Sequence, residues 1–194
     1  MIAKLKGKID ELKPTAVILD VNGVGYQLFI PLTTFERIQK QEEVSLYVFT
    51  LHKEDQMKLF GFYTDGEKEI FQLLLNISGI GPAMALSVLS GIRIEILVEA
   101  VKTGTPALLT GIPGIGKSKA EKLVFELKRK LKKLEIYADP SPRKPSVRNE
   151  AVEAMMSLGF DEAKSSRAVD AIIDKFPEIT LEHAVKNALK SLAG

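Results

Sequence analysis

The chain has 194 residues, of which 45% are hydrophobic and 27% are charged, and its formal net charge is +2. This composition is typical of a globular protein and excludes disorder throughout, and the length allows one large domain or two to three small ones. The sequence contains no Cys and two His, which excludes disulfides, iron–sulfur clusters, a cysteine nucleophile and a histidine-rich metal site. No segment reaches the roughly 18–20 apolar residues that cross a bilayer, and the N-terminus has no signal-peptide core, so we expect a cytoplasmic protein without a membrane partner.

Residues 1–63 alternate between apolar and polar side chains, which predicts β-strands with one buried face. Asn22-Gly23 lies between two alternating runs and is typical of a type I′ hairpin turn. The alternating runs occupy residues 4–9, 17–21, 24–30, 44–48 and 57–62. These short runs predict a small closed barrel, because closure removes the unpaired edges of an open sheet.

Residues 64–136 change to helical spacing. Thr64 and Glu67 form a capping-box pattern, and Thr105-Pro106 is a second signal for the start of a helix. The apolar residues after the capping box fall on one helical face: Ile70, Leu73, Leu74 and Ile77. We expect short helices interrupted by glycine in this region.

Prolines at 140, 142 and 145 predict an extended, mobile linker over residues 137–147. Residues 148–194 then contain three short helical patterns, at 152–158, 163–173 and 181–192. The sequence therefore predicts a separate small helical bundle after the linker.

An internal repeat is the most informative feature of the sequence. Residues 76–85 and 111–120 align at a constant offset, and each copy contains Gly-Ile-Gly between two helical patterns. We expect the glycines to allow positive φ and close backbone approach, and the isoleucines to point inward. The residues concerned are Gly79, Ile80 and Gly81 in the first copy and Gly114, Ile115 and Gly116 in the second.

A helix that begins after such a turn directs backbone N–H groups outward, which is a site for one phosphate. Two copies side by side predict contact with two phosphates of one strand, independent of base sequence. The second copy opens onto Lys117, Lys119 and Lys122, and residues 117–133 carry eight basic side chains against two acidic ones. The alternative interpretations are glycine-terminated helices without a ligand and a solvated basic helix face.

Gly111–Ser118 also satisfies the Walker A pattern of nucleotide-binding loops. That pattern requires a preceding buried strand, whereas residues 105–110 resemble one helical turn, and the first copy has Pro82-Ala83 in place of Lys and Ser. Glu54-Asp55 is expected at a hairpin tip. The pair is either an ordinary acidic turn or part of a nuclease metal site, but a metal site would need further carboxylates, and the sequence offers no suitable cluster.

These features together resemble the RuvA family over essentially the whole chain. The resemblance is carried by residues 1–9, 22–26, 54–55 and 59–62, and by the paired glycine turns. It implies an OB-type five-stranded barrel at 1–63, a tandem helix-hairpin-helix domain at 64–136, a flexible linker at 137–147 and a three-helix domain similar to ubiquitin-associated domains at 148–194. The fold class is thus multidomain, β followed by α.

The resemblance further implies a non-catalytic subunit that binds four-way Holliday junctions in DNA recombination, repair and the SOS response. It implies a homotetramer, sometimes doubled to an octamer, that holds the junction open and flat. The last domain would bind the hexameric ATPase RuvB, and the resolvase RuvC is a further expected partner. The glycine turns and the three lysines would contact phosphates, and Glu54 and Asp55 would form the acidic pin of the family.

No catalytic residue, cofactor or metal is expected. The sequence departs from the family pattern at Pro82-Ala83-Met84, which lacks a lysine that relatives often carry, so the first turn is expected to rely on backbone donors. Two alternative functions stay open at this point: a P-loop nucleotidase that uses Gly111–Ser118, and a protein-interaction adaptor that acts through the C-terminal bundle.

Overall fold

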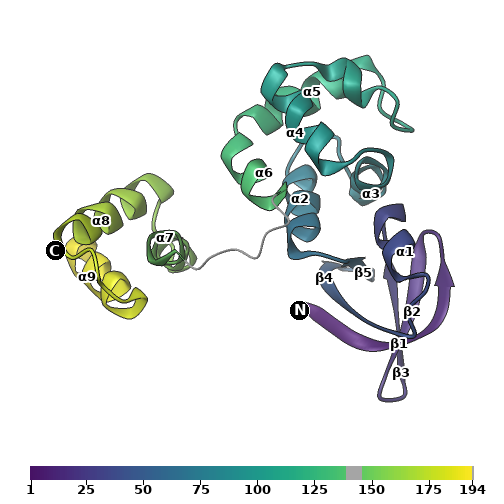
Figure 1. The fold of residues 1–194 in the computed structure, drawn as a ribbon, viewed down its shortest axis with the longest axis horizontal. Coiled ribbons are helices and arrows are strands. Elements are labelled where there is room, and N and C mark those ends of the chain that lie inside the picture. The colour runs from purple at the N-terminus through teal and green to yellow at the C-terminus, as the bar shows by residue number, and fades with distance from the viewer. Residues whose placement is uncertain (139–145, 194) are drawn as a thin grey trace. The chain divides into compact units, whose positions relative to one another are not determined.

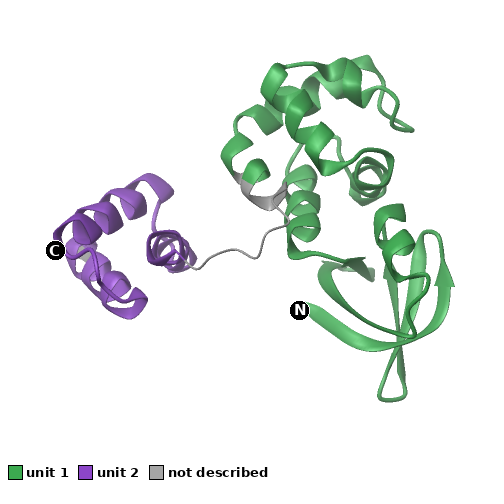
Figure 2. Cartoon of the chain, viewed as in Figure 1, with its two compact units in different colours: residues 1–140 green, residues 141–194 purple. Residues whose placement is uncertain are grey.

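A computed structural model describes residues 1–138 and 146–193 (Figure 1). The chain forms two compact units, residues 1–140 and residues 141–194 (Figure 2). The first unit contains all the predicted strands and both glycine turns.

The N-terminal part of the first unit is a closed barrel in the strand order β1-β2-β3-β5-β4. Its strands are β1 (Lys4–Lys13), β2 (Ala16–Val21), β3 (Val24–Phe29), β4 (Glu43–Lys53) and β5 (Gln56–Phe62). Neighbouring strands are antiparallel except β3 and β5, which pair in parallel through Leu28 and Phe29. This five-stranded closure confirms the predicted OB-type barrel.

The alternating pattern places one side of each strand in the barrel core, where Val17, Leu19, Leu28 and Leu46 are almost fully buried. The β2–β3 turn has φ of 53° at Asn22 and 85° at Gly23, as a type I′ turn requires. The alternating pattern therefore predicts the barrel correctly, and the Asn22-Gly23 pair predicts this hairpin correctly.

Helix α1 (Leu32–Ile38) lies between β3 and β4 and was not predicted. It has seven residues and no capping side chain at its N-terminus. A helix this short has too few turns to give a periodic signal in the sequence. Its Thr34 and Ile38 are buried, so the helix is held by its contacts with the rest of the first unit.

The remainder of the first unit is helical. Its elements are α2 (Asp65–Leu75), α3 (Pro82–Gly91), α4 (Ile94–Thr103), the 3₁₀ helix η1 (Pro106–Leu109), α5 (Lys117–Lys128) and α6 (Leu131–Ala138). The capping box of Thr64 and Glu67 is confirmed, and the predicted apolar face of α2 is buried. The start signal at Thr105-Pro106 produces one 3₁₀ turn rather than an α-helix.

Two buried residues of β5 belong to the hydrophobic core of the helices, whereas the interior of the barrel forms a separate core of its own. The Phe71 ring on α2 lies 5.1 Å from that of Phe60 and 4.9 Å from that of Phe62, both on β5, measured between ring centroids. The change from alternating to helical spacing near residue 63 is therefore a change in local structure within one compact unit.

In residues 146–193 the structure has three helices: α7 (Val147–Ser157), α8 (Glu162–Lys175) and α9 (Leu181–Ala193). Asp161 caps α8 by accepting hydrogen bonds from the N–H groups of Ala163 and Lys164. The expected linker at 137–147 overlaps the end of α6 and the start of α7, and residues 139–145 lie outside the described residues. Among the described helices, none combines the length and hydropathy needed to cross a membrane.

Candidate nucleic-acid interface

The two glycine turns have the same geometry. Gly79 and Gly114 have φ of 88° and 83°, in the left-handed region that glycine adopts without strain. Ile80 and Ile115 are 6% and 3% exposed, and each donates its N–H to the carbonyl three residues earlier, at 3.0 Å in both copies. The isoleucines therefore hold the turns from inside, as predicted, while Gly79 and Gly114 lie on the surface.

The second glycine of each turn differs from the prediction. Gly81 and Gly116 have φ of −92° and −81°, which any residue can adopt, so the expectation of positive φ holds only for the first glycine of each turn. A Cβ built at either position meets no heavy atom within 4 Å. Neither backbone geometry nor packing within the described chain requires glycine at these two positions.

Gly81 and Gly116 are the N-cap residues of α3 and α5. Glycine has no side chain that could accept hydrogen bonds from the first turn of a helix, and Ser, Asn or Asp would cap better. The first N–H groups of a helix have no intrahelical acceptor, and the helix dipole places partial positive charge there. Each turn therefore presents N–H groups without an intrahelical acceptor beside an open surface, one fewer at α3 because its first residue, Pro82, has no N–H. This arrangement binds a phosphate.

The two turns lie next to each other. The ammonium group of Lys122 on α5 donates to the carbonyl oxygen of Ser78 in the first turn, at 2.6 Å. A Cβ at Gly114 in the second turn would lie 3.1 Å from Cε of Met84 on α3. The sequence assigned Lys122 to the second turn, whereas the structure places its charge at the first turn, where Ala83 provides none.

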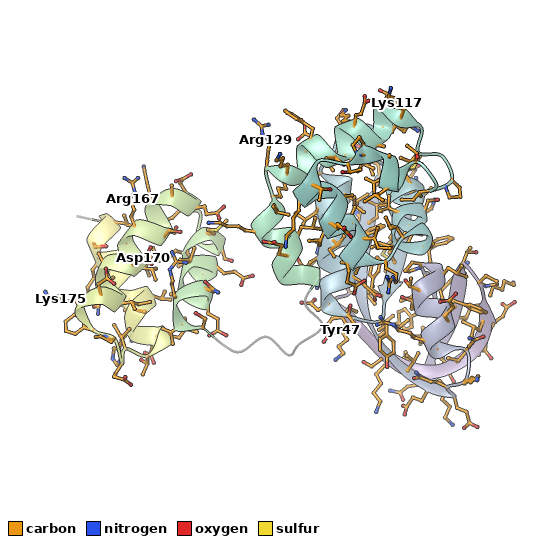
Figure 3. The ribbon with its side chains drawn as sticks, turned by 45° about the horizontal axis from the view of Figure 1, so that its top comes forward. Tyr47, Lys117, Arg129, Arg167, Asp170 and Lys175 are labelled. Atoms are coloured by element: carbon orange, nitrogen blue, oxygen red, sulfur yellow. The ribbon has the colours of Figure 1, made fainter. Side chains whose placement is uncertain are left out.

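The other lysines remain with the second turn. Lys119 donates to the carbonyl oxygen of Gly114, at 3.2 Å, and Lys117 is exposed at the start of α5. Figure 3 shows Lys117 and Arg129 projecting away from the core along the same edge of the helical part. Basic side chains of α5 and of its C-cap residue, Arg129, therefore extend the positive surface that begins at the turns.

Glu54 and Asp55 form the exposed two-residue turn between β4 and β5, confirming the predicted hairpin tip. Neither carboxylate forms an ion pair with any residue that the structure describes. In OB folds the β4–β5 loop commonly contacts nucleic acid, and here that loop carries two negative charges. Across residues 1–138 and 146–193 no group of three or more His, Asp or Glu side chains is arranged to hold a metal ion.

The Walker A interpretation of Gly111–Ser118 fails on its structural context. A P-loop follows a buried strand, but the element before Gly111 is the 3₁₀ helix η1. The segment forms the second glycine turn, whose shape matches that of the first turn at Gly79–Gly81. Residues 111–118 are therefore half of a paired structure and have no strand to position a nucleotide.

Three family models match consecutive parts of the chain. They are described as RuvA N terminal domain, at residues 1–61, SAM-like Helix-hairpin-helix tandem, at 71–129, and RuvA, C-terminal domain, at 146–193. A relative from Geobacter sulfurreducens, named Holliday junction branch migration complex subunit RuvA, is 43% identical over 99% of both chains. A relative of the same name from Pseudomonas savastanoi pv. phaseolicola is 37% identical over 99% of this chain and 100% of its own.

The chain belongs to the RuvA family. The matched segments cover the barrel, the paired glycine turns and the C-terminal helices in the order expected from the sequence. They also confirm the predicted fold class, a barrel followed by a helix-hairpin-helix part and a helical C-terminal part.

The C-terminal unit of this RuvA family member exposes apolar side chains of its own. Leu158 is 58% and Phe176 is 49% exposed. A shallow groove lies beside Phe176 between α8 and α9, lined by Lys175, Phe176, Pro177, Glu178, Ile179, Thr180, His183 and Asn187. Contiguous apolar surface with a polar rim is typical of a site that binds another protein, and the groove combines Phe176, Pro177 and Ile179 with polar side chains.

Proposed function

We propose that this chain is a non-catalytic subunit that binds four-way DNA junctions through phosphates, without reading base sequence. The observation that carries the proposal is the pair of open glycine positions, Gly81 and Gly116, next to free helix N-termini. A phosphate oxygen that approaches a backbone N–H needs the space that a side chain would fill. Branch migration of Holliday junctions, the activity in the names of the relatives, agrees with this chemistry.

The lysines add charge to backbone recognition. Lys117 and Lys119 stand at the second turn, and Lys122 reaches the first. We infer that on DNA binding the ammonium of Lys122 contacts the phosphate held by the first turn, because it already lies beside Ser78. Lys122→Met is then expected to reduce the salt dependence of binding by about one phosphate contact.

Glu54 and Asp55 have a different proposed role. Four copies of this hairpin, meeting at the centre of a tetramer, would repel the phosphates at the crossover and keep the strands apart. Such an arrangement holds the junction open and flat and disfavours linear duplex, which has no opening to receive the hairpins. The tetramer, and its doubling to an octamer around the junction, are parts of this proposal.

The C-terminal domain expected from the sequence, residues 148–194, is proposed to bind RuvB, the ATPase that drives branch migration. The groove beside Phe176 supplies an apolar contact with a polar rim. RuvC is a further proposed partner of the junction-bound complex. Substituting Phe176→Ser is expected to abolish branch migration driven by RuvB and to leave junction binding unchanged. If the chain were a protein-interaction adaptor without a DNA role, the native chain would not bind the junction either.

The deciding experiment compares binding of the full chain to an immobile four-way junction and to duplexes of the same total sequence. We expect at least about tenfold tighter binding to the junction, equal affinity for junctions of unrelated sequence, and a linear decrease of log affinity with log salt concentration. Equal affinity for junction and duplex would refute the proposal. Retention of radiolabelled ATP by the chain alone would instead support nucleotide binding at Gly111–Ser118.

A further inference from the structure

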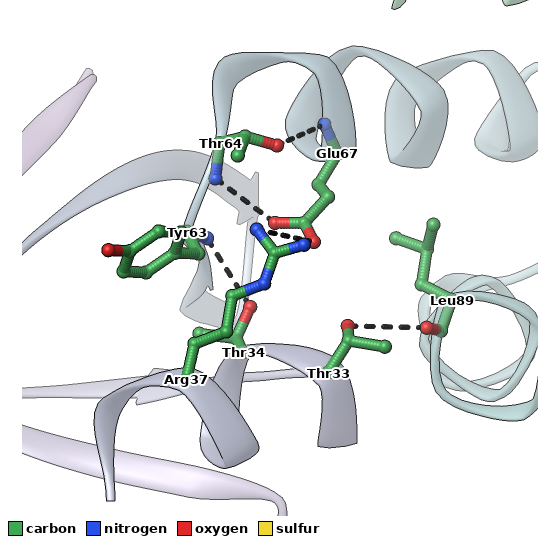
Figure 4. A network of polar contacts seen from close by, with 7 residues as sticks. All are labelled: Thr33, Thr34, Arg37, Tyr63, Thr64, Glu67 and Leu89. Carbon is green, nitrogen blue, oxygen red and sulfur yellow. Dashed lines mark hydrogen bonds and ion pairs between the residues drawn. The ribbon is translucent and has the colours of Figure 1, made fainter. Parts of the chain in front are cut away.

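Helix α1 of the barrel contacts the helix that leads into the first glycine turn. The hydroxyl oxygen of Thr34 accepts a hydrogen bond from the N–H of Tyr63, at 3.3 Å, where β5 passes into α2. The Arg37 guanidinium lies 3.9 Å from the carboxylate of Glu67 on α2 and 5.2 Å from the ring centroid of Tyr63. Figure 4 shows these side chains converging on the start of α2.

The same helix contacts the end of the helix that leads out of that turn. The hydroxyl of Thr33 donates to the carbonyl oxygen of Leu89, at 3.3 Å (Figure 4). The hydroxyl oxygen of Ser90 accepts a hydrogen bond from the N–H of Leu32, at 2.9 Å. Both helices that flank the first phosphate turn are therefore attached to one short helix of the barrel.

Glu67 is the unusual member of this network because its carboxylate is buried, with 4% of the side chain exposed. It accepts a hydrogen bond from the N–H of Thr64, at 3.0 Å, and Thr64 accepts one from the N–H of Glu67, at 3.2 Å. A buried carboxylate stabilises a fold little compared with an apolar side chain of the same size, but it is costly to leave unpaired. The pairing with Arg37 therefore favours one orientation of α2 on the barrel over others.

The aromatic core beneath this network constrains that orientation through packing, and the polar contacts add directional constraints to it. Hydrophobic burial is non-directional, and the rings of Phe60, Phe62 and Phe71 would stay buried through small rotations of α2. Hydrogen bonds and ion pairs depend on distance and angle. The polar contacts of α1 are thus the directional part of the interface between barrel and helices.

The path from the acidic hairpin to the phosphate turn is continuous. The tip at Glu54 and Asp55 leads into β5, about 23 Å long at the usual rise of a strand, and then into α2, about 16 Å long at the usual rise of a helix. The bend between β5 and α2 is at Tyr63 and Thr64, where the contacts of α1 converge. A change of about 10° at this bend would move the acidic tip relative to the turn by about 4 Å, which is the angle multiplied by the length of β5.

We propose that α1 acts as a clamp, defined by Thr33, Thr34 and Arg37 with their partners Glu67 and Ser90, that sets the position of the acidic hairpin relative to the phosphate turns. Its residues are positioning residues and do not touch DNA. Selection of a junction over a duplex depends on this distance, whereas contact with the phosphates of one strand does not. The inference rests on the proposed function for its DNA readout and has a second readout that does not.

The first test is the double variant Arg37→Met/Glu67→Gln. Glutamine retains the capping hydrogen bond at its position, and methionine retains apolar contact with Tyr63, so the ion pair is removed without leaving a buried charge. The matched control is Lys102→Met/Glu135→Gln, which removes the 2.6 Å ion pair between α4 and α6 and, like the clamp variant, leaves the net charge unchanged. A second variant, Thr33→Val/Ser90→Ala, cuts the α3 side of the clamp.

We expect both clamp variants to lower the ratio of junction affinity to duplex affinity by about tenfold, with duplex affinity and its salt dependence unchanged. The control is expected to leave the ratio unchanged. A parallel loss of junction and duplex affinity in the clamp variants would show a general structural role and overturn the proposal. An unchanged ratio in both variants would overturn it as well.

The second readout measures the distance between the acidic hairpin and the second turn, which depends on the angle between barrel and helices, and it needs no DNA. The chain has no Cys, so spin labels on Met57→Cys and Glu121→Cys, both exposed positions, report the distance between hairpin and second turn in a sample diluted with unlabelled chain. The clamp variants are expected to broaden the distance distribution, whereas the control Lys102→Met/Glu135→Gln is expected to leave it unchanged. A narrow, unshifted distance distribution in the clamp variants would overturn the clamp proposal whatever the DNA measurements give. If the native chain binds junction and duplex equally well, only the proposed function is overturned.

Discussion

Alanine substitution at the four turn glycines separates what the fold requires from what a DNA ligand requires. Gly79 and Gly114 have positive φ, so an alanine there is strained by about 1–2 kcal/mol. Gly79→Ala meets no neighbour, whereas the new Cβ at Gly114 would lie 3.1 Å from the flexible end of Met84. We expect both variants to lower the free energy of unfolding by about that strain, with Gly114→Ala slightly the more affected.

Gly81→Ala and Gly116→Ala, in contrast, are expected to change the free energy of unfolding little. Their φ values suit alanine and the added methyl group meets nothing within 4 Å. Alanine is a poorer N-cap than glycine by a few tenths of a kcal/mol or more, but it also reduces the entropy of the unfolded chain by a similar amount. The free energy of unfolding should therefore change by less than about 0.5 kcal/mol.

The effect on binding should be large at those same two positions. A methyl group beside the helix N-terminus prevents a phosphate from reaching the N–H groups, and a hydrogen bond to a charged group contributes about 1.5–3 kcal/mol, so each variant should weaken junction binding by about tenfold or more. Urea unfolding measures the free energy of unfolding. Fluorescence anisotropy with a labelled junction, at one fixed salt concentration, measures the junction affinity. Native affinity in the Gly81→Ala/Gly116→Ala double variant would refute phosphate contact at the turns.

Three further predictions concern charge. Lys119→Ala should weaken binding to all junction sequences about equally and reduce the slope of log affinity against log salt by about 0.9; a sequence-dependent loss in gel shifts would argue against a phosphate contact. Glu54→Gln with Asp55→Asn should bind junctions equally well or more tightly and change the rate of branch migration in the assembly with RuvB, so weaker binding would show that the sign assigned to the hairpin is wrong. In the C-terminal unit the hydrogen bond from Arg148 holds the pKa of Asp170 below its ordinary value. The ionised Asp170 side chain therefore stabilises the folded unit fully above about pH 4, and this stabilisation is lost as the pH falls further. Because both side chains are nearly half exposed, Asp170→Asn should cost less than about 1 kcal/mol near neutral pH, and hydrogen exchange over residues 146–193 during acid titration should show a smaller loss of protection in the variant.

Local features of the sequence determined much of this protein. Alternation at period two gave the barrel, the Asn22-Gly23 pair gave its first hairpin, and Thr64 with Glu67 gave the start of α2. The repeat gave two turns of equal shape with their isoleucines inside. Each of these signals acts over a few residues, where backbone sterics, side-chain period and capping chemistry decide the conformation.

The tertiary structure decided what those elements do together. Lys122 meets Ser78 across 44 residues of chain, and Leu32 meets Ser90 across 58. Arg37 had no visible role in the sequence, and Glu67 was recognisable as a cap but not as the partner of an ion pair. Such contacts depend on how packed elements approach each other, and a sequence pattern carries no record of that approach because many arrangements bury the same apolar faces equally well.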